Sequence, residues 1–178
     1  MAKIMIVEDD IIVGTLLKNT LTNLGYKITS ISPSAELALK KLEEDTPDLI
    51  ITDIILDGDI DGIDLAKMVI KNYKIPLIFL TSTIDNQTVK RIKETEVYGY
   101  LLKPFEEKEL YVNIEFALYR NHMENEILQK NKTFQLIAEF DEAISFLSLN
   151  DIIGNTFKFL REKMGLQYSS IILSDIYK

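Results

Sequence analysis

The sequence predicts an α/β fold in which five parallel strands form a doubly wound sheet with helices on both faces. Five short apolar runs recur within residues 1–104, and segments with the spacing of amphipathic helices separate them. Two runs, "DLIIT" and "PLIFL", are continuously apolar, which is typical of strands buried on both faces. Strands that alternate with helices in this way form a parallel sheet, because each helix carries the chain back across one face.

The predicted elements follow one another regularly. Strands are expected at Lys3–Val7, Lys27–Ile31, Asp48–Thr52, Ile75–Leu80 and Tyr98–Leu102. The intervening helices are expected at 11–24, 32–45, 62–73 and 85–94, the last being the most polar.

Helix ends carry their own signals. Asp10 is expected to cap the first helix, and Gly25 to end it. In the second helix, Ser32 is expected to be the cap and Pro33 the first helical residue.

The pattern turns helical at Phe105 and continues without glycine or proline to Asp151. Its first apolar positions could cover the sheet as a fifth helix: Leu110, Ile114, Ala117 and Leu118. The final stretch, "YSSIILSDIYK", is predicted to be one short terminal strand.

Composition excludes several classes of protein. Apolar residues make up 47% of the 178 residues and charged residues 27%, which is typical of a soluble globular chain. Cysteine is absent, and no apolar run approaches the roughly 20 residues of a membrane span, so a cytoplasmic protein without membrane contact is expected. The net charge of −8 disfavours direct DNA binding.

Polar residues stand where four of the predicted strands end. They are Glu8 and Asp9, then Asp53, Thr81 and Lys103. Parallel sheets bind ligands at the carboxyl ends of their strands, so these side chains should meet at one edge.

This set of side chains favours phosphoryl transfer. Three carboxylates repel one another unless a cation lies among them, and oxygen ligands alone favour Mg²⁺ or Mn²⁺. A lysine and a threonine could bind phosphoryl oxygens, and a carboxylate can act as the nucleophile and become an acyl phosphate.

Four segments in order resemble the receiver domain of two-component response regulators: "IMIVEDD", "PDLIITDIIL", "IPLIFLTST" and "GYLLKPF". Their spacings also match, with 44 residues from Asp9 to Asp53, 28 to Thr81 and 22 more to Lys103. The resemblance implies a flavodoxin-like sheet and a switch that takes a phosphoryl group from a histidine kinase or phosphotransfer protein. It implies no enzyme activity beyond self-phosphorylation and autodephosphorylation.

By position, the resemblance assigns a role to each matching residue. Asp53 would accept the phosphoryl group, and Mg²⁺ would be held by Glu8, Asp9, Asp53 and the backbone carbonyl of Ile55. The same resemblance implies that Lys103 and Thr81 bind phosphoryl oxygens, that Tyr100 is an aromatic switch residue, and that the Lys103–Pro104 peptide is cis. The switching surface would be the fourth helix, fifth strand and fifth helix.

Two alternatives compete with this interpretation. "DGDIDGIDLAKM" has the spelling of a calcium loop, but Met68 stands where a bidentate glutamate is needed and Leu65 offers no oxygen. A haloacid-dehalogenase-like phosphatase would have a second aspartate two residues after the nucleophile, where Ile55 stands. The loop "ILDGDIDGID" also departs from the receiver pattern, because it lacks a proline and is about one residue longer.

Three parts are expected along the chain: a receiver at 1–120, a helical linker at 121–132 and a helical tail at 133–178. The tail resembles the beginning of a GAF-type sensory domain. Two copies of the chain could pair through these C-terminal helices.

Overall fold

A computed structural model describes residues 1–82, 85–144 and 149–164. Its centre is a sheet of five parallel strands in the order β2-β1-β3-β4-β5. The strands are β1 (Lys3–Val7), β2 (Lys27–Ser32), β3 (Leu49–Asp53), β4 (Leu77–Thr81) and β5 (Gly99–Leu102). The predicted fold class is therefore confirmed for the sheet.

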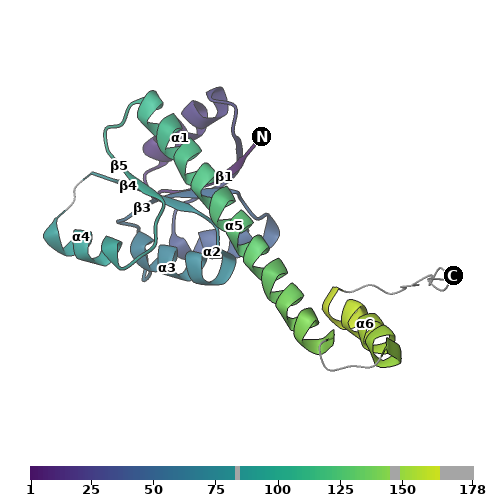
Figure 1. Ribbon diagram of the computed structural model, residues 1–178. Coiled ribbons are helices and arrows are strands. Elements are labelled where there is room, and N and C mark those ends of the chain that lie inside the picture. The colour runs from purple at the N-terminus through teal and green to yellow at the C-terminus, as the bar shows by residue number, and fades with distance from the viewer. Residues whose placement is uncertain (83–84, 145–148, 165–178) are drawn as a thin grey trace. The chain divides into compact units, whose positions relative to one another are not determined.

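The helices are α1 (Ile11–Asn23), α2 (Ala35–Glu44), α3 (Gly62–Tyr73), α4 (Asn86–Lys93), α5 (Glu107–Ile144) and α6 (Leu149–Met164). In Figure 1, α1 and the first part of α5 lie on one face of the sheet, and α2 and α3 lie on the other. The chain divides into two compact units, residues 1–123 and 124–178.

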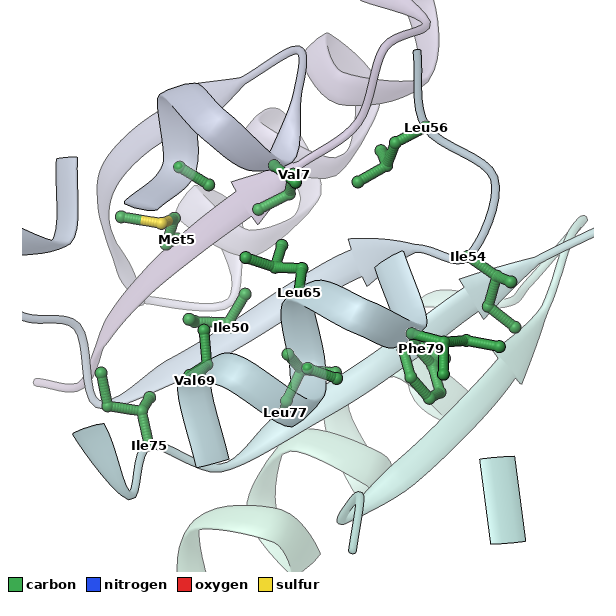
Figure 2. Close-up of a cluster of buried hydrophobic side chains, with 14 of the residues drawn as sticks. Met5, Val7, Ile50, Ile54, Leu56, Leu65, Val69, Ile75, Leu77 and Phe79 are labelled. Atoms are coloured by element: carbon green, nitrogen blue, oxygen red, sulfur yellow. The ribbon is translucent and has the colours of Figure 1, made fainter. Parts of the chain in front are cut away.

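Alternate residues of the central strands point to opposite faces of the sheet and belong to two separate hydrophobic cores. On one face, Met5 and Val7 of β1 and Phe79 of β4 pack with apolar side chains of α2 and α3, as Figure 2 shows for Leu65 and Val69. All five of these side chains are completely buried. Burial of apolar area on this scale is the main force that holds the two helices to the sheet.

The second core lies on the other face of the sheet. Ile4 and Ile6 of β1 pack there with Leu17 of α1 and with the buried side of α5. Leu110, Ile114 and Ala117 are completely buried and Leu118 packs beside them, so the prediction that these residues cover the sheet is confirmed.

Helix caps agree with the sequence at α1 and differ at α2. Asp10 caps α1 by accepting from the backbone amides of Ile12 and Val13, as predicted. The prediction for Ser32 and Pro33 is wrong, because Ser34 is the N-cap and α2 begins at Ala35. Ser32 is held in the sheet instead, where it pairs with Val7 and its carbonyl accepts from the amide of Glu8.

The second unit contains the later part of α5 together with α6. Within it, the rings of Phe140 and Phe159 lie 5.1 Å apart, and Lys163 forms an ion pair with Glu139 at 3.4 Å. The predicted terminal strand falls in residues 165–178, outside the described residues. Among the helices of the described residues, none combines the length and apolarity that a membrane crossing requires.

Candidate functional site

The carboxyl ends of four strands bring the predicted site residues to one edge of the sheet. Asp53 is the last residue of β3 and Thr81 the last of β4, while Glu8 directly follows β1 and Lys103 directly follows β5. The register pairs Asp53 with Leu80 and Thr81 with Leu102, so the strands end almost level. Their side chains therefore share one edge because of the parallel topology.

Three carboxylates converge at this edge. Glu8, Asp9 and Asp53 each place one carboxylate oxygen within 4.8 Å of the others. Glu8 is 3% exposed and Asp53 is 9% exposed. Within the described part of the chain, this is the one group of three or more such ligands that could hold a metal ion.

Lys103 lies between two of these acids and offsets their repulsion. Its Nζ donates to the Glu8 carboxylate at 2.9 and 2.8 Å and to Oδ2 of Asp53 at 2.5 Å. Burial by itself would lower the pKa of Lys103, but its hydrogen bonds and charge pairing with Asp53 and Glu8 outweigh burial and raise the pKa. The ammonium is thus firmly retained.

Glu8 shows the opposite balance. Burial raises the pKa of Glu8 above the ordinary value, and the charges of Asp53 and Asp9 add to that effect. The hydrogen bond from Lys103 opposes it without cancelling it. Burial in this cluster therefore favours the protonated form of Glu8 more than water does.

The donor set fits a hard divalent cation. Carboxylate oxygens from Glu8, Asp9 and Asp53 are the ligands that Mg²⁺ and Mn²⁺ prefer, and the cluster offers neither sulfur nor imidazole to a softer metal. A divalent ion would also supply the positive charge that three acids beside one lysine require.

The backbone around Asp53 is closely fixed. The amide of Ile55 donates to Oδ1 of Asp53 at 3.0 Å, and the hydroxyl of Thr52 donates to the Asp53 carbonyl at 2.9 Å. Gly62, the first residue of α3, lies so close that a Cβ there would collide with the same carbonyl oxygen. The carboxylate of Asp53 is thereby oriented by its own loop.

The other predicted site residues are Thr81 at the end of β4, Tyr100 within β5, and Pro104 after Lys103. Thr81 is buried, and its carbonyl accepts from the amide of Lys103 at 2.8 Å. The Lys103–Pro104 peptide bond is cis. Tyr100 is 56% exposed and lines a groove of about 410 Å³ with residues of β5 and α5, among them Leu102, Lys108 and Val112.

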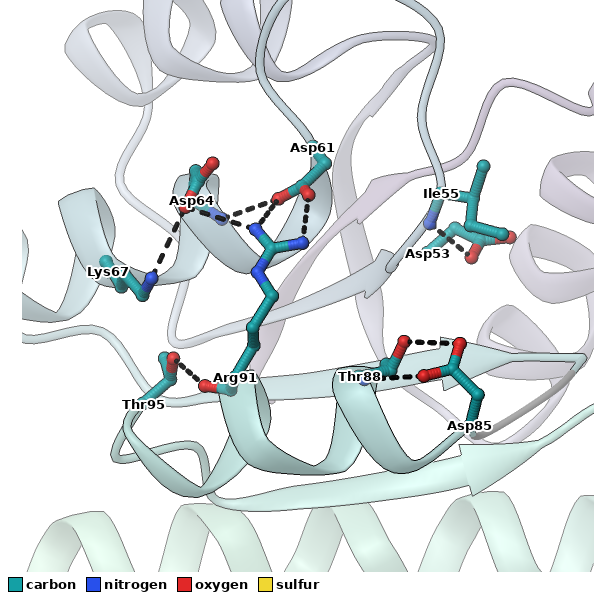
Figure 3. A network of polar contacts seen from close by, with 9 residues as sticks. All are labelled: Asp53, Ile55, Asp61, Asp64, Lys67, Asp85, Thr88, Arg91 and Thr95. Carbon is teal, nitrogen blue, oxygen red and sulfur yellow. Dashed lines mark hydrogen bonds and ion pairs between the residues drawn. The ribbon is translucent and has the colours of Figure 1, made fainter.

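The aspartates of the calcium-like loop are used differently. Asp61 caps α3 by accepting from the amide of Asp64 at 2.9 Å, and it also accepts from both terminal nitrogens of Arg91 on α4 (Figure 3). Asp57 and Asp59 are exposed and belong to no ligand cluster among the residues that the structure describes. The sequence did not point to Arg91, because the pair depends on how α3 and α4 pack.

Comparisons with known proteins agree with this geometry. The family model of the response regulator receiver domain matches residues 4–115. The chain is 32% identical over 125 residues to the transcriptional regulatory protein AfsQ1 of Streptomyces coelicolor, covering 70% of this chain and 55% of that protein, so it spans about half the length of this relative. It is 30% identical over 179 residues to the uncharacterized transcriptional regulatory protein YrkP of Bacillus subtilis, covering 94% of this chain and 75% of YrkP.

Among solved structures, the signal receiver domain of a modulated diguanylate cyclase from Desulfovibrio desulfuricans aligns with a TM-score of 0.67 and 31% identity. The alignment covers 70% of this chain and 98% of that domain.

These findings separate the competing interpretations. The phosphatase alternative is not supported, because the matching family and the relatives are response regulators. The structure also disfavours a calcium site in the loop, because the carboxylate of Asp61 already caps α3 and forms an ion pair with Arg91. With four strand ends meeting at an acidic site and the family model covering residues 4–115, the chain belongs to the response regulators of two-component signalling and contains their receiver domain.

Proposed function

We propose that Asp53 is the phosphoacceptor and takes its phosphoryl group from a phosphohistidine of a histidine kinase or phosphotransfer protein. The observation that carries the proposal is the Asp53 carboxylate at the end of buried β3, in contact with Lys103 and beside two further acids. The P–N bond of the phosphohistidine breaks as a carboxylate oxygen forms the new P–O bond. Imidazole is the leaving group, and the product is an acyl phosphate on Asp53.

The surrounding residues have separate tasks in this proposal. Glu8, Asp9, Asp53 and the Ile55 carbonyl would hold Mg²⁺, or Mn²⁺ in its place, which supplies charge neutralisation when bound. Lys103 already carries a firmly held proton and would pair with the phosphoryl oxygens, and the hydroxyl of Thr81 would donate to another. Turnover at Asp53 would be limited to phosphorylation and autodephosphorylation.

Several large apolar side chains on α1 and after β3 are exposed. Ile11 and Ile12 at the start of α1 are 82% and 80% exposed, Leu16 one turn later is 56% exposed, and Ile55 after Asp53 is 71% exposed. Exposed large apolar side chains favour docking of another protein. We place the donor protein on this surface.

Phosphorylation would change the surface formed by α4, β5 and α5, and this surface would control the output partner. Phosphorylation changes the charge at Asp53 from −1 to about −2, which would draw Thr81 and Lys103 toward the new group. Tyr100 lies on β5 and lines the groove together with residues of α5. The net charge of −8 favours a protein partner over direct contact with DNA.

We also propose a division into a receiver at 1–120, a helical linker at 121–132 and a helical tail at 133–178 with the character of a partial GAF-type domain. The compact unit at 1–123 and the helical state of 121–132 within α5 support the first two parts. The tail would pair two copies of the chain.

The acceptor is tested by incubating the protein with acetyl phosphate and Mg²⁺ and measuring intact mass. One phosphate should be added to the wild-type chain and none to Asp53→Asn, which keeps the shape of the side chain and removes the nucleophile. An adduct that persists in Asp53→Asn, or steady hydrolysis of unrelated phosphomonoesters, would overturn the proposal.

A further inference from the structure

The loop between β3 and α3, residues 54–61, connects Asp53 to the first turn of α3. The amide of Gly62 donates to the carbonyl of Ile54 at 2.9 Å, which closes the loop at its base. Since a Cβ on Gly62 would collide with the Asp53 carbonyl, the start of α3 rests directly on the backbone of Asp53. Any displacement of this turn would therefore reach Asp53 and Ile55.

A side chain from α4 holds this turn in place. Arg91 donates to both carboxylate oxygens of Asp61, at 2.6 and 3.1 Å, and lies 3.3 Å from Oδ1 of Asp64 (Figure 3). A bidentate ion pair of this kind fixes the orientation of the two side chains as well as their distance, because the planar guanidinium matches the geometry of the carboxylate. The side chains of Arg91 and Asp61 are 36% and 33% exposed, so the pair is partly shielded from water.

The Asp61 carboxylate and the Arg91 backbone each make a further hydrogen bond besides the ion pair. Asp61 is the N-cap of α3, and its carboxylate already accepts from the Asp64 amide. Arg91 lies within α4, where its carbonyl accepts from the hydroxyl of Thr95 at 3.0 Å. Because the Asp61 side chain is already restrained by the cap, the ion pair costs less conformational entropy than one between two free surface side chains.

The other side of the loop faces α2. Gly58 has a φ of +125°, and a Cβ there would lie 3.1 and 3.2 Å from the carboxylate oxygens of Glu36. Hydrogen bonds from its own backbone amide and from Ser34 lower the pKa of Glu36 most, and the backbone amides of Asp59 and Ile60 in the loop add to this. The loop is thus held between α2 and α4, and Arg91 provides its contact with α4.

We propose that Arg91 is a positioning residue of the acceptor site: by holding Asp61 it fixes the start of α3, and through it the backbone that presents Asp53 and Ile55. The inference rests on the proposed function, in which these two residues hold the cation. Because α4 also belongs to the proposed switching surface, the ion pair connects that surface to the site. Coupling is reciprocal, so the position of α4 should affect the Mg²⁺ affinity, and Mg²⁺ should affect α4.

The test is a double-mutant cycle on the full chain with Arg91→Ala and Asp61→Asn, read out by calorimetric titration with Mg²⁺. Asparagine caps a helix as well as aspartate does, so Asp61→Asn keeps the cap while it removes the charge and one of the two oxygens that accept from Arg91. Each single variant should weaken Mg²⁺ binding about tenfold, the low end for residues that orient metal ligands, and the double variant should be no weaker than either. Arg91→Lys should recover part of the affinity.

Lys90→Ala is the matched control, because Lys90 is an exposed cation of the same helix and lies outside the ion-pair network. Equal Mg²⁺ affinity in Arg91→Ala and Lys90→Ala, with only the melting temperature of Arg91→Ala lowered, would overturn the inference and leave the pair a purely structural contact. Failure of the proposed function would be seen elsewhere, as a wild-type protein that binds Mg²⁺ but accepts no phosphoryl group from acetyl phosphate.

Discussion

At the scale of single residues, the proposed acceptor site is a balance of charges between three acids and one lysine. Glu8 and Asp53 are both buried, and a charged group out of water needs a partner of opposite charge. Lys103 contacts both. Burial would lower the pKa of Lys103, but pairing with the two acids raises it, whereas burial raises the pKa of Glu8 in spite of the lysine. The lysine and a divalent cation therefore compete for the same carboxylates.

This competition predicts the direction in which the Mg²⁺ affinity changes in Lys103→Met. The substitution keeps most of the side-chain length and removes the charge. Mg²⁺ affinity should rise at least about tenfold, because a unit charge at ion-pair distance leaves the site. Binding of beryllofluoride, a phosphoryl analogue, should fall at the same time, because Lys103 is its proposed partner. Titration calorimetry measures both, with the exposed Lys18→Met as control. A drop in Mg²⁺ affinity would contradict the competition.

At the scale of elements, the junction between β2 and α2 shows how a strand can override a capping signal. Ser32 is drawn into the sheet by its pairing with Val7, and its buried hydroxyl has no hydrogen-bond partner among the described residues. Ser34 takes the cap two residues later and accepts from the amide of Leu37 at 3.4 Å. Two similar serines thus have opposite energetic roles.

The two serines should respond oppositely to alanine. Ser34→Ala should lower the free energy of unfolding by about 1 kcal/mol, as loss of an N-cap usually does. Ser32→Ala should leave it unchanged or raise it slightly, because a buried hydroxyl without a partner is removed. Urea unfolding followed by circular dichroism measures both variants. If Ser32→Ala lowered the free energy of unfolding more than Ser34→Ala does, Ser32 and not Ser34 would be the residue that stabilises the start of α2.

The contact between α3 and α4 should show a defined pH dependence. Burial alone would raise the pKa of Asp61, but the hydrogen bonds from Arg91 and from backbone amides outweigh it and lower the pKa below 3.8. A lowered folded pKa stabilises the protein above the unfolded pKa, and that stabilisation is lost as the pH falls through the folded pKa. The pair therefore contributes at neutral pH and fades below the unfolded value.

Wild type and Arg91→Ala should accordingly differ most in unfolding free energy near neutral pH. The difference should shrink as the pH falls below about 4, once Asp61 is protonated in the unfolded chain and then in the folded one. Urea titrations at several pH values measure the difference, and Lys90→Ala serves as a control with no comparable trend. A difference that stays constant into acid would show that the ionised form of Asp61 is not involved.

At the scale of the whole molecule, the chain joins a sheet-based unit to a helical one through α5. The portion of α5 within residues 1–123 has a buried side that covers the sheet. In the portion within residues 124–178, Ile127, Phe134 and Ile137 are 59%, 70% and 52% exposed. Apolar side chains spaced along one helix favour contact with another helix, in keeping with the proposed pairing of two copies.

The pairing predicts a difference between the full chain and residues 1–123. The full chain should show the mass of a dimer in light scattering at micromolar concentration, and the shorter chain the mass of a monomer. Phe134→Glu in the full chain should shift it toward monomer, because a charge would be buried in the contact. Glu126→Gln, an exposed change on the same helix, is the control. A monomeric full chain whose tail resists protease would contradict the pairing.

Local signals in the sequence are sufficient to predict the parallel sheet, its flanking helices and the polar residues that meet at one edge of the sheet. Apolar runs and helical spacing act over a few residues, and parallel strands necessarily end at one edge, so the order of the chain alone groups Asp53, Thr81 and Lys103.

Which charges meet, in contrast, depends on tertiary packing. Lys103 and Glu8 are 95 residues apart, and Arg91 and Asp61 are 30 apart, so each pair forms only because helices and strands pack together. The same holds for Ser32, whose capping signal is overridden by its pairing across the sheet. Hydrogen bonding between strands is set by partners distant in the chain, and no local pattern around a residue contains that information.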